Sequence, residues 1–467
     1  MTSVSLEVRS HNPTTRKVSL LEKLFIWSLI TEPLLFFILS SRDVIGFPIT
    51  LSRIFQGSFL LLYGLNIILN RKRIPTKYQL RGPDHYIIFY CLLILFSSFI
   101  GVFAGNYSVN NYLEVSSGIY FRPVFEAFLL IYYFVYFLVL PRFFIYSKAQ
   151  LLYLFKWVIR VFYLVITLGL FDILANVLGF DLIPRHLVDS RWVTIGLRFH
   201  SLAGEPRDAF VYLFFGLSIL YLMTGLNLKT PPKRTFIFLI FFCIALTQSF
   251  SGIAGVLFGL ILFLIFTKIS FKNYLVFVVL ILISIIIGYI SIKYSLRIQN
   301  YINMFLTLPE VFKSSDTLPY LAMVQSPDIV PLWLFLEKIL EFDLYSVFFG
   351  SGIGSASFAT NNFMNITEGI VNNPRSQLTR LLFESGIIAT YFYLLILIKP
   401  VKWLRGIVKK NYWPLIWVSS IMLFGSVLGH RSNLGLIFVG IVLAVIINRP
   451  FEAASSGKPE SQKIPEN

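Results

Sequence analysis

Long apolar stretches alternate with short polar connections along most of the chain. Each stretch runs for about twenty residues, the length that an α-helix needs to cross a bilayer core of about 30 Å. This pattern predicts an all-α, polytopic integral membrane protein with about twelve transmembrane helices. The predicted spans are residues 24–40, 47–69, 85–104, 119–140, 151–178, 209–226, 236–250, 252–266, 274–292, 378–398, 412–428 and 434–447.

Lysine and arginine are concentrated in alternate connections, which are residues 71–81, 141–148, 229–234, 267–272 and 399–410. Basic connections stay in the cytoplasm, so both termini are predicted to be cytoplasmic. The predicted domains are a cytoplasmic segment 1–23, one transmembrane domain 24–450 and a disordered tail 451–467. Two large loops, at about residues 180–208 and 293–377, then lie on the outer side. Residues 332–349 have helical spacing and are expected to form an amphipathic helix at the membrane surface or capping the bundle, although packing alone also explains them.

The net charge of +17 needs no nucleic-acid partner, because topology accounts for most of it. The two cysteines, Cys91 and Cys243, lie in apolar runs, so no disulfide framework is expected. The first span has no cleavage-site pattern before or after it and is interpreted as retained rather than as a signal peptide.

Arginine is also frequent on the predicted outer side, where the same topology rule does not favour it. A planar guanidinium binds phosphate through two parallel hydrogen bonds, and free N–H groups at helix starts attract anions as well. A charge deep in a span costs at least about 2.5 kcal/mol and is a functional candidate by default. The alternatives are ordinary: Arg122 and Glu126 are one turn apart and are expected to pair. The arginines favoured for anion binding are Arg191, Arg198, Arg207, Arg375 and Arg380.

The loop 189–208 combines these arginines with carboxylates, an imidazole and an indole. Glu205 is the first candidate for a general base, with Asp208 and Glu384 next. Helix capping around Pro206 explains Glu205 and Asp208 equally well. His200 and Trp192 are interpreted as sugar-binding residues, and a structural role for His200 stays open.

Several motifs together resemble the bacterial O-antigen polymerase and ligase superfamily, the polymerases more than the ligases. Arg185 to Gly196 and Arg375 to Gly386 both show an R-x10-G spacing in or beside the two large loops. The runs LTQSFSGIAGVLFGL (246–260), FGSGIGSASF (349–358) and NPRSQLTRLLFESGIIATYFYL (373–394) are similar to family motifs. Where many relatives have a histidine that ligases are supposed to use as a base, this chain has Arg375-Ser376.

The resemblance implies a fold like that of GT-C glycosyltransferases, with about twelve helices and two large periplasmic loops, in the bacterial inner membrane. It implies a glycosyltransferase that moves a glycan from undecaprenyl diphosphate to the non-reducing end of a lipid-linked repeat unit. The residues expected to bind the diphosphate are Arg191, Arg198, Arg375 and Arg380, with Arg207 and Arg431 as second choices. The stabilisation of a leaving diphosphate by arginines in a partly dry site fits this chemistry.

The expected partners are an undecaprenyl-diphosphate-linked oligosaccharide and membrane lipid, with a chain-length regulator left open. No cofactor and no metal are expected, because there is no outer Asp-x-Asp, no His/Cys cluster and no nucleotide-binding glycine loop. Two alternatives remain. One is an O-antigen ligase that transfers finished glycan to lipid A–core, and the other is a transporter or flippase of anionic lipid-linked substrates.

Overall fold

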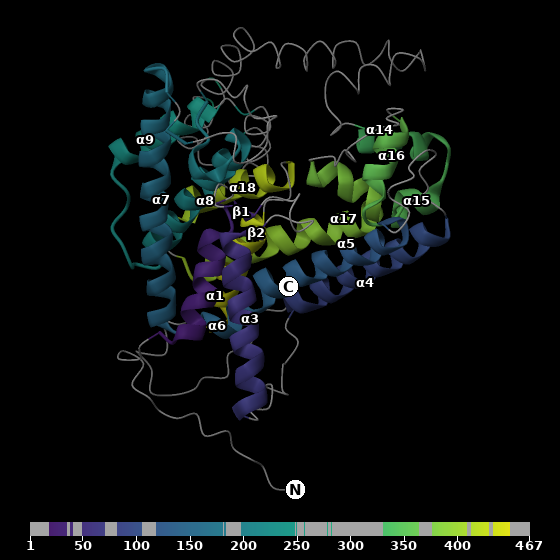
Figure 1. The fold of residues 1–467 in the computed structure, drawn as a ribbon, viewed down its shortest axis with the longest axis horizontal. Coiled ribbons are helices and arrows are strands. Elements are labelled where there is room, and N and C mark those ends of the chain that lie inside the picture. The colour runs from purple at the N-terminus through teal and green to yellow at the C-terminus, as the bar shows by residue number, and fades with distance from the viewer. Residues whose placement is uncertain are drawn as a thin grey trace, which may run out of the picture.

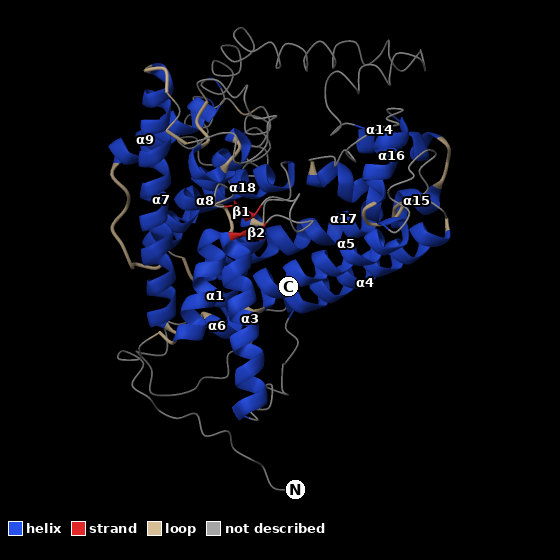
Figure 2. Cartoon of the chain, viewed as in Figure 1, coloured by secondary structure: helices blue, strands red, loops and turns tan. Residues whose placement is uncertain are grey.

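The computed structural model describes residues 18–34, 38–40, 49–70, 82–104, 118–180, 182–183, 198–247, 330–363, 376–408, 412–428 and 433–448, with the single positions 249, 256, 278 and 282. These residues are almost entirely helical, with one short pair of strands (Figures 1 and 2). The expected all-α architecture is therefore confirmed for this part of the chain.

In the described residues, six helices are long and apolar enough to cross a membrane. Three shorter apolar helices accompany them. The predicted spans 252–266 and 274–292 lie outside the described residues except at three positions, so the number of twelve stays a prediction. The long helices are α3 (Leu51–Asn70), α4 (Gly82–Phe103), α5 (Gly118–Phe134) with its continuations η1 (Val135–Val139) and α6 (Pro141–Phe144), α7 (Lys148–Val177), α8 (Pro206–Gly225), and α17 (Gln377–Trp403) with η5 (Leu404–Gly406). The shorter ones are α9 (Arg234–Thr247), α18 (Tyr412–Leu428) and α19 (Leu434–Asn448).

The first helix differs from its prediction. The span 24–40 was expected to be one helix, but α1 (Leu20–Thr31) ends at Thr31, and a strand, β1 (Ile38–Ser40), follows it. Strand β1 pairs antiparallel with β2 (Ile49–Thr50), with Ile38 opposite Thr50. The physical reason lies in Pro33, which has no N–H to donate to the preceding turn and therefore stops the helix.

The expected helix over 332–349 is interrupted. It consists of α14 (Val330–Leu340) and α15 (Leu344–Phe349), separated at Phe342, whose φ of 56° is left-handed. The Asp343 carboxylate begins α15 by accepting a hydrogen bond from Ser346 N at 3.1 Å. Hydrogen bonding from Ser346 lowers the pKa of Asp343, since it stabilises the carboxylate. A further short helix, α16 (Ser355–Phe363), follows a glycine-rich turn.

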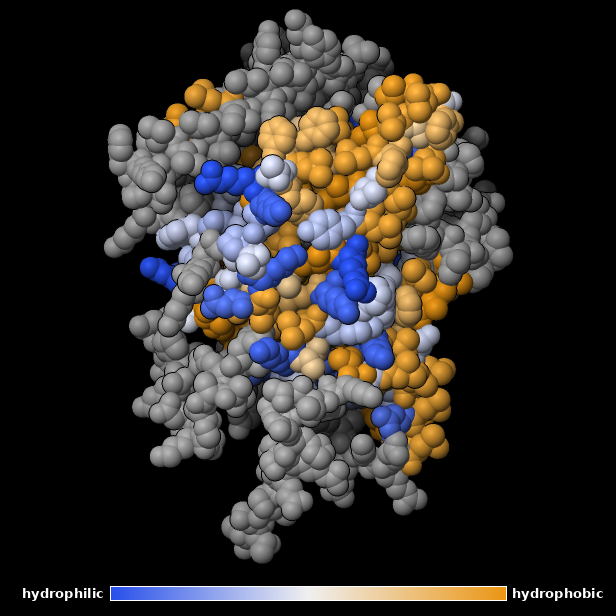
Figure 3. Space-filling model, turned by 90° about the vertical axis from the view of Figure 1, so that its left-hand side faces the viewer, coloured by the Kyte–Doolittle hydropathy of each residue, from blue (hydrophilic) through white to orange (hydrophobic). Residues whose placement is uncertain are grey.

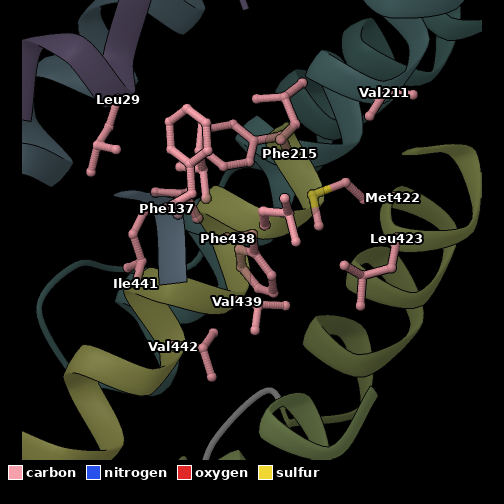
Figure 4. Close-up of a cluster of buried hydrophobic side chains, with 14 of the residues drawn as sticks. Leu29, Phe137, Val211, Phe215, Met422, Leu423, Phe438, Val439, Ile441 and Val442 are labelled. Carbon is pink, nitrogen blue, oxygen red and sulfur yellow. The ribbon is translucent and has the colours of Figure 1, made fainter. Parts of the chain in front are cut away.

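The centre of the molecule is formed by helices that are apolar on every face. All side chains of α19 from Leu434 to Val445 are buried, and α8 is almost as completely enclosed. Figure 4 shows Phe438 of α19 among Phe137 of η1, Phe215 of α8 and Met422 of α18. A helix that is hydrophobic all round belongs in the interior of a large assembly. Helices α8, α18 and α19 are therefore the core around which the others pack.

The two ends of α19 mark two ends of the bundle, each held by polar contacts. At the Asn448 end, Asn448 Nδ2 donates to the carbonyls of Arg142 and Ile145 at 2.7 and 3.1 Å. There, Arg142 also pairs with Asp84 at the start of α4. At the Asn433 end, Asn433 Nδ2 donates to Glu32 Oε1 at 2.7 Å, which joins the start of α19 to the end of α1. The termini of different helices are thus tied together at both ends.

We expect Gly440→Ala to destabilise the protein. A Cβ at Gly440 would overlap the carbonyl oxygen of Phe137, which is backbone and cannot rotate away. Overpacking of this kind costs about 1–3 kcal/mol. Thermal unfolding of the purified protein in detergent should show a clearly lower midpoint for this variant.

The matched control is Gly57→Ala in α3, where nothing lies within 4 Å of the new Cβ. Alanine has the higher helix propensity, so this variant should unfold at the same temperature as the wild type or slightly above it. Equal midpoints for the two variants would contradict the packing of α19 against η1.

Candidate functional site

A small pocket opens at the Asn433 end of the bundle, between α5, α17, α18 and the start of α19. Its volume is about 20 Å³, room for about one water molecule. Its polar lining is formed by Glu126, Gln377, Ser426 and Asn433. Gln377 Oε1 is buried and has no hydrogen-bond partner among the described residues. Because an unpaired buried acceptor costs about 1–3 kcal/mol, this oxygen requires a hydrogen-bond donor, and the pocket has room for one water molecule or one hydroxyl group to supply it. We call this site the Gln377 pocket.

A polar network supports one wall of the Gln377 pocket. The Glu32 carboxylate at the end of α1 accepts hydrogen bonds from Ser52 Oγ, from Gln56 Nε2 at 3.0 Å and from Asn433 Nδ2. Gln56 Oε1 in turn accepts a hydrogen bond from Tyr132 of α5 at 2.9 Å. Because its donors come from α3 and from Asn433, and Gln56 of α3 also binds Tyr132, Glu32 fixes where Asn433 lies relative to α3 and α5.

The segment before α8 is fixed to two neighbouring helices. Arg198 Nε donates to the carbonyl of Thr247 at 3.0 Å, and Phe199 N donates to that of Leu246 at 2.9 Å. Both carbonyls belong to the last turn of α9, where free carbonyls favour a nearby cation. Ser201 Oγ donates to the carbonyl of Val165 at 2.6 Å, and Ser201 begins the short 3-10 helix η4 (Ser201–Ala203). Arg198 therefore makes a structural contact through Nε, and its other donors are in a half-buried position.

His200 contacts Asp172, a buried acid that the sequence analysis did not select. His200 Nε2 lies 3.1 Å from Asp172 Oδ2 of α7, and both side chains are nearly inaccessible. His200 Nδ1 lies 3.2 Å from the carbonyl of Ser201. Asp172 Oδ1 also accepts a hydrogen bond from Ile183 N at 3.0 Å. These contacts show His200 as a residue that fixes the loop onto α7, which is the structural role that the sequence left open.

The start of α8 gathers three of the predicted site residues. Glu205 is the N-cap residue of α8, but its side chain makes no capping hydrogen bond. Its Oε2 instead pairs with Arg207 Nη2 at 3.2 Å. Arg207 Nε is buried and has no hydrogen-bond partner in the described part of the chain. Asp208 lies in the first turn, where a carboxylate is favoured by the helix dipole. The arrangement leaves one guanidinium donor of Arg207 for an anion.

The start of α8 and the Gln377 pocket lie at the same end of the bundle. Phe210, one turn after Arg207, packs beside Gly425 of α18, where an added Cβ would meet its ring at 3.4 Å. The next residue, Ser426, lines the Gln377 pocket. Figure 1 shows α8 and α18 close to each other. A buried cationic donor and a buried neutral acceptor, both unpaired in the described structure, are thus associated with adjacent helix ends.

Arg380 and Glu384 form a buried ion pair one turn apart on α17. Arg380 Nη2 lies 3.0 Å from Glu384 Oε1, with side-chain exposures of 4% and 3%. Arg380 Nε donates to the same oxygen at 3.2 Å. Glu384 Oε1 also accepts a hydrogen bond from Ala356 N at 3.3 Å, in the first turn of α16. Because Arg380 and Ala356 N both donate to the Glu384 carboxylate, the geometry gives the pair a structural role, and the predicted substrate roles of both residues stay predictions.

A break in α17 brings this ion pair against a glycine-rich turn. Gly386 has φ 75° and ψ 179°, so the helix bends there. A Cβ at Gly386 would overlap the carbonyl of Phe348, and one at Gly350 would overlap that of Glu384. Gly352 N and Ser97 Oγ donate to the Glu384 carbonyl at 2.9 and 2.6 Å. The glycines are required because two backbones are in direct contact at this point.

Several predicted site residues cannot be placed. Arg191, Trp192, Arg375 and Arg431 lie outside the described residues. In the described ranges, no group of three or more His, Cys, Asp or Glu side chains is arranged to hold a metal ion. The two acids missed by sequence analysis, Asp172 and Glu32, had one available signal, since each is an isolated carboxylate in a predicted apolar span.

We expect Arg380→Met to destabilise the fold strongly. The substitution leaves the Glu384 carboxylate buried without its cation, which costs about 3–5 kcal/mol. The double variant Arg380→Met with Glu384→Gln removes both charges and should recover part of the loss. The thermal unfolding midpoint measures both effects.

Lys338→Gln is the control, because Lys338 forms an exposed pair with Glu341 in which the side chains are 36% and 53% accessible. Exposed pairs contribute little, so its midpoint should match the wild type. If Arg380→Met behaved like Lys338→Gln, the buried pair would not be structural.

Comparison with known proteins adds no assignment to this geometry: no family model matches the chain, and no curated protein matches it significantly.

Proposed function

We propose that this protein is a polysaccharide polymerase of the bacterial inner membrane, which transfers a glycan from undecaprenyl diphosphate to the non-reducing end of a lipid-linked repeat unit. One observation carries the proposal. Arg207 Nε, at the start of α8, and Gln377 Oε1, at the start of α17, are buried and unpaired among the described residues, and both helices border the end of α18. A sugar diphosphate requires both kinds of partner, a cationic donor for phosphate oxygens and a neutral acceptor for a hydroxyl group.

The neighbouring sequence supports an anion site at this pocket. Arg375 precedes Gln377 by two positions, and Arg431 precedes Asn433 by two. Two residues span at most about 7 Å, so covalent connectivity limits how far these backbone positions can be from the pocket lining. Arg207 at the start of α8 adds a guanidinium from a distant part of the chain. We infer that Arg207, Arg375 and Arg431 are the first candidates to bind the diphosphate, and that Arg191 and Arg198 extend the site.

The proposed reaction needs charge stabilisation and one proton transfer. A hydroxyl of the incoming repeat unit attacks the anomeric carbon, and the bond from that carbon to the phosphate oxygen breaks. Undecaprenyl diphosphate leaves with the electron pair, and arginines stabilise the charge that develops. The hydroxyl proton passes to a carboxylate, for which Glu205 is preferred and Asp208 is second. Glu384 is less suited, because its carboxylate already accepts from Arg380 and Ala356 N.

The ligase and transporter alternatives make different demands. A transporter of the inverted-repeat type binds near the middle of its spans, whereas the polar groups described above lie at helix ends. A ligase shares the donor and the diphosphate site, so the acceptor distinguishes it. In cells, loss of a polymerase leaves single repeat units on the acceptor lipid, and loss of a ligase leaves none.

We expect Gln377→Met to shorten the surface polysaccharide without lowering stability. The two side chains have similar length, and methionine removes an oxygen that has no partner among the described residues, so the unfolding midpoint should stay or rise. Complementation of a chromosomal deletion, followed by gel analysis of the glycan, measures chain length. Full-length polymer from a stable Gln377→Met protein would contradict the pocket's role.

Glu205→Gln and Arg207→Gln should each reduce the polymer to mostly single repeat units. Loss of a general base slows a reaction by about 10²–10⁴-fold, and loss of one charge-stabilising donor by about 10²–10³-fold. Both side chains are partly accessible, at 17% and 15%, so the proteins should still fold. Arg405→Gln, in the exposed turn after α17, is the charge-matched control and should give normal polymer. If both site variants also give normal polymer, the assignment of Glu205 and Arg207 to the substrate site is wrong.

A further inference from the structure

The exposed stripe of α7 changes from basic to apolar partway along the helix. Lys156 and Arg160 are exposed on successive turns. The next exposed large apolar side chains are Tyr163, Leu164 and Phe171, which are 41%, 49% and 56% accessible. Helix α7 has 30 residues, more than the roughly 20 that cross a bilayer core. Part of it therefore extends beyond the hydrocarbon, and the change along the stripe indicates where.

The exposed side chains of helix α9 also change from basic to apolar, beside the point where those of α7 change. Lys233 and Arg234 are exposed at its start, and the following exposed side chains include Phe238 and Phe242, at 75% and 49%. The ring of Phe236 lies 4.9 Å from that of Tyr163 on α7. This contact aligns the two changes, so the basic side chains of both helices border one apolar surface.

Aromatic rings underlie the basic side chains. Lys229 Nζ, in the connection between α8 and α9, lies 6.0 Å from the centroid of the Tyr163 ring. Arg160 Cζ lies 4.8 Å from the Trp157 ring. Tyrosine and tryptophan with flanking basic residues are typical of the level of lipid headgroups. The rings hold the long aliphatic stems in place while the charged groups stay accessible.

The positive charge of this face is not neutralised by acids on the same elements. The acid of α7, Asp172, is buried beside His200, and residues 226–238 contain no Asp or Glu. Figure 3, which faces the side of the molecule formed by α7 and α9, shows hydrophilic side chains grouped between hydrophobic areas. We define the basic belt as the exposed or partly exposed basic residues of α7, α9 and their neighbouring connection, which are Lys156, Arg160, Lys229, Lys233 and Arg234.

We propose that the basic belt is a binding site for the phosphate headgroups of anionic phospholipids in the leaflet at this level. The exposed aromatic and aliphatic side chains beyond it would contact the acyl chains of the same lipids. Topology alone requires basic residues somewhere in a cytoplasmic connection. It does not require basic residues of two separate segments to meet on one face, at one level, over aromatic rings. The belt is independent of the Gln377 pocket and of the reaction proposed there.

The test compares lipids of different charge with the full-length protein purified in a non-ionic detergent. Phosphatidylglycerol or phosphatidylcholine is added in mixed micelles, and the unfolding midpoint and the lipids retained in native mass spectra are measured. The wild type should be stabilised more by phosphatidylglycerol, and high salt should remove the difference, because the belt is exposed to screening. Each basic residue near an anionic surface contributes roughly fivefold in affinity.

The variant Arg160→Gln with Lys229→Gln and Lys233→Gln should bind phosphatidylglycerol on the order of 100-fold more weakly and lose most of its preference for this lipid. The charge-matched control changes Lys23, Lys402 and Arg405, all exposed and outside the belt, to Gln and should keep the preference. The midpoint in phosphatidylcholine shows that each variant is folded. A preference in the belt variant as large as that of the wild type, or an equal loss in the control, would overturn the proposal.

Discussion

The buried ion pair between Arg380 and Glu384 is the polar interaction on which the packing around α17 depends. Within an apolar interior, a carboxylate is stable only when its oxygens are satisfied. Glu384 meets this requirement with its own helix through Arg380 and with the first turn of α16 through Ala356 N. Its carbonyl receives Gly352 N and Ser97 Oγ. One residue thus joins α4, α16, α17 and the glycine-rich turn, and α17 bends beside it at Gly386.

The start of α17, before this bend, borders the Gln377 pocket. Gln377 opens α17 and faces a pocket whose other polar residues come from α5, α18 and the start of α19. The network around Glu32 fixes Asn433, and the contact of Phe210 with Gly425 keeps α8 beside α18. Helix ends that are distant in sequence therefore share one end of the bundle. Two of the buried polar atoms that are unpaired in the described structure, Arg207 Nε and Gln377 Oε1, belong to these helix ends, where we propose that the substrate binds.

The sequence predicted the apolar helices well where length and pattern agreed, as for the span 209–226, which forms α8. The prediction of one helix over 24–40 was wrong, because the apolar residues continue beyond Pro33 while the helix ends at Thr31. Arg380 and Glu384 are spaced by one helical turn, so their contact follows from helix geometry alone. The approach of Ala356 N to Glu384 does not follow from any local pattern. The same holds for Asp172 and His200, which are brought together by the packing of a loop on α7.

For the candidate site residues, the structure shows the contacts of those in the described ranges, while their chemistry stays a prediction. Arginines and acids in outer loops indicated an anion site, and the residues with described geometry occur at helix ends. The sequence could not distinguish a side chain whose hydrogen bonds are made within the fold, such as Glu384, from one with an unpaired donor in the described structure, such as Arg207. That difference depends on which neighbours the tertiary structure supplies.

The most direct measurement is the incubation of the purified protein with undecaprenyl-diphosphate-linked repeat units, without nucleotide or added metal. A polymerase should convert the single units into a ladder of lipid-linked oligomers that lengthens with time. Unchanged single units from a folded protein would contradict the account. In a parallel reaction to which lipid A–core is added, transfer of glycan to this acceptor without any increase in the number of joined repeats would also contradict it.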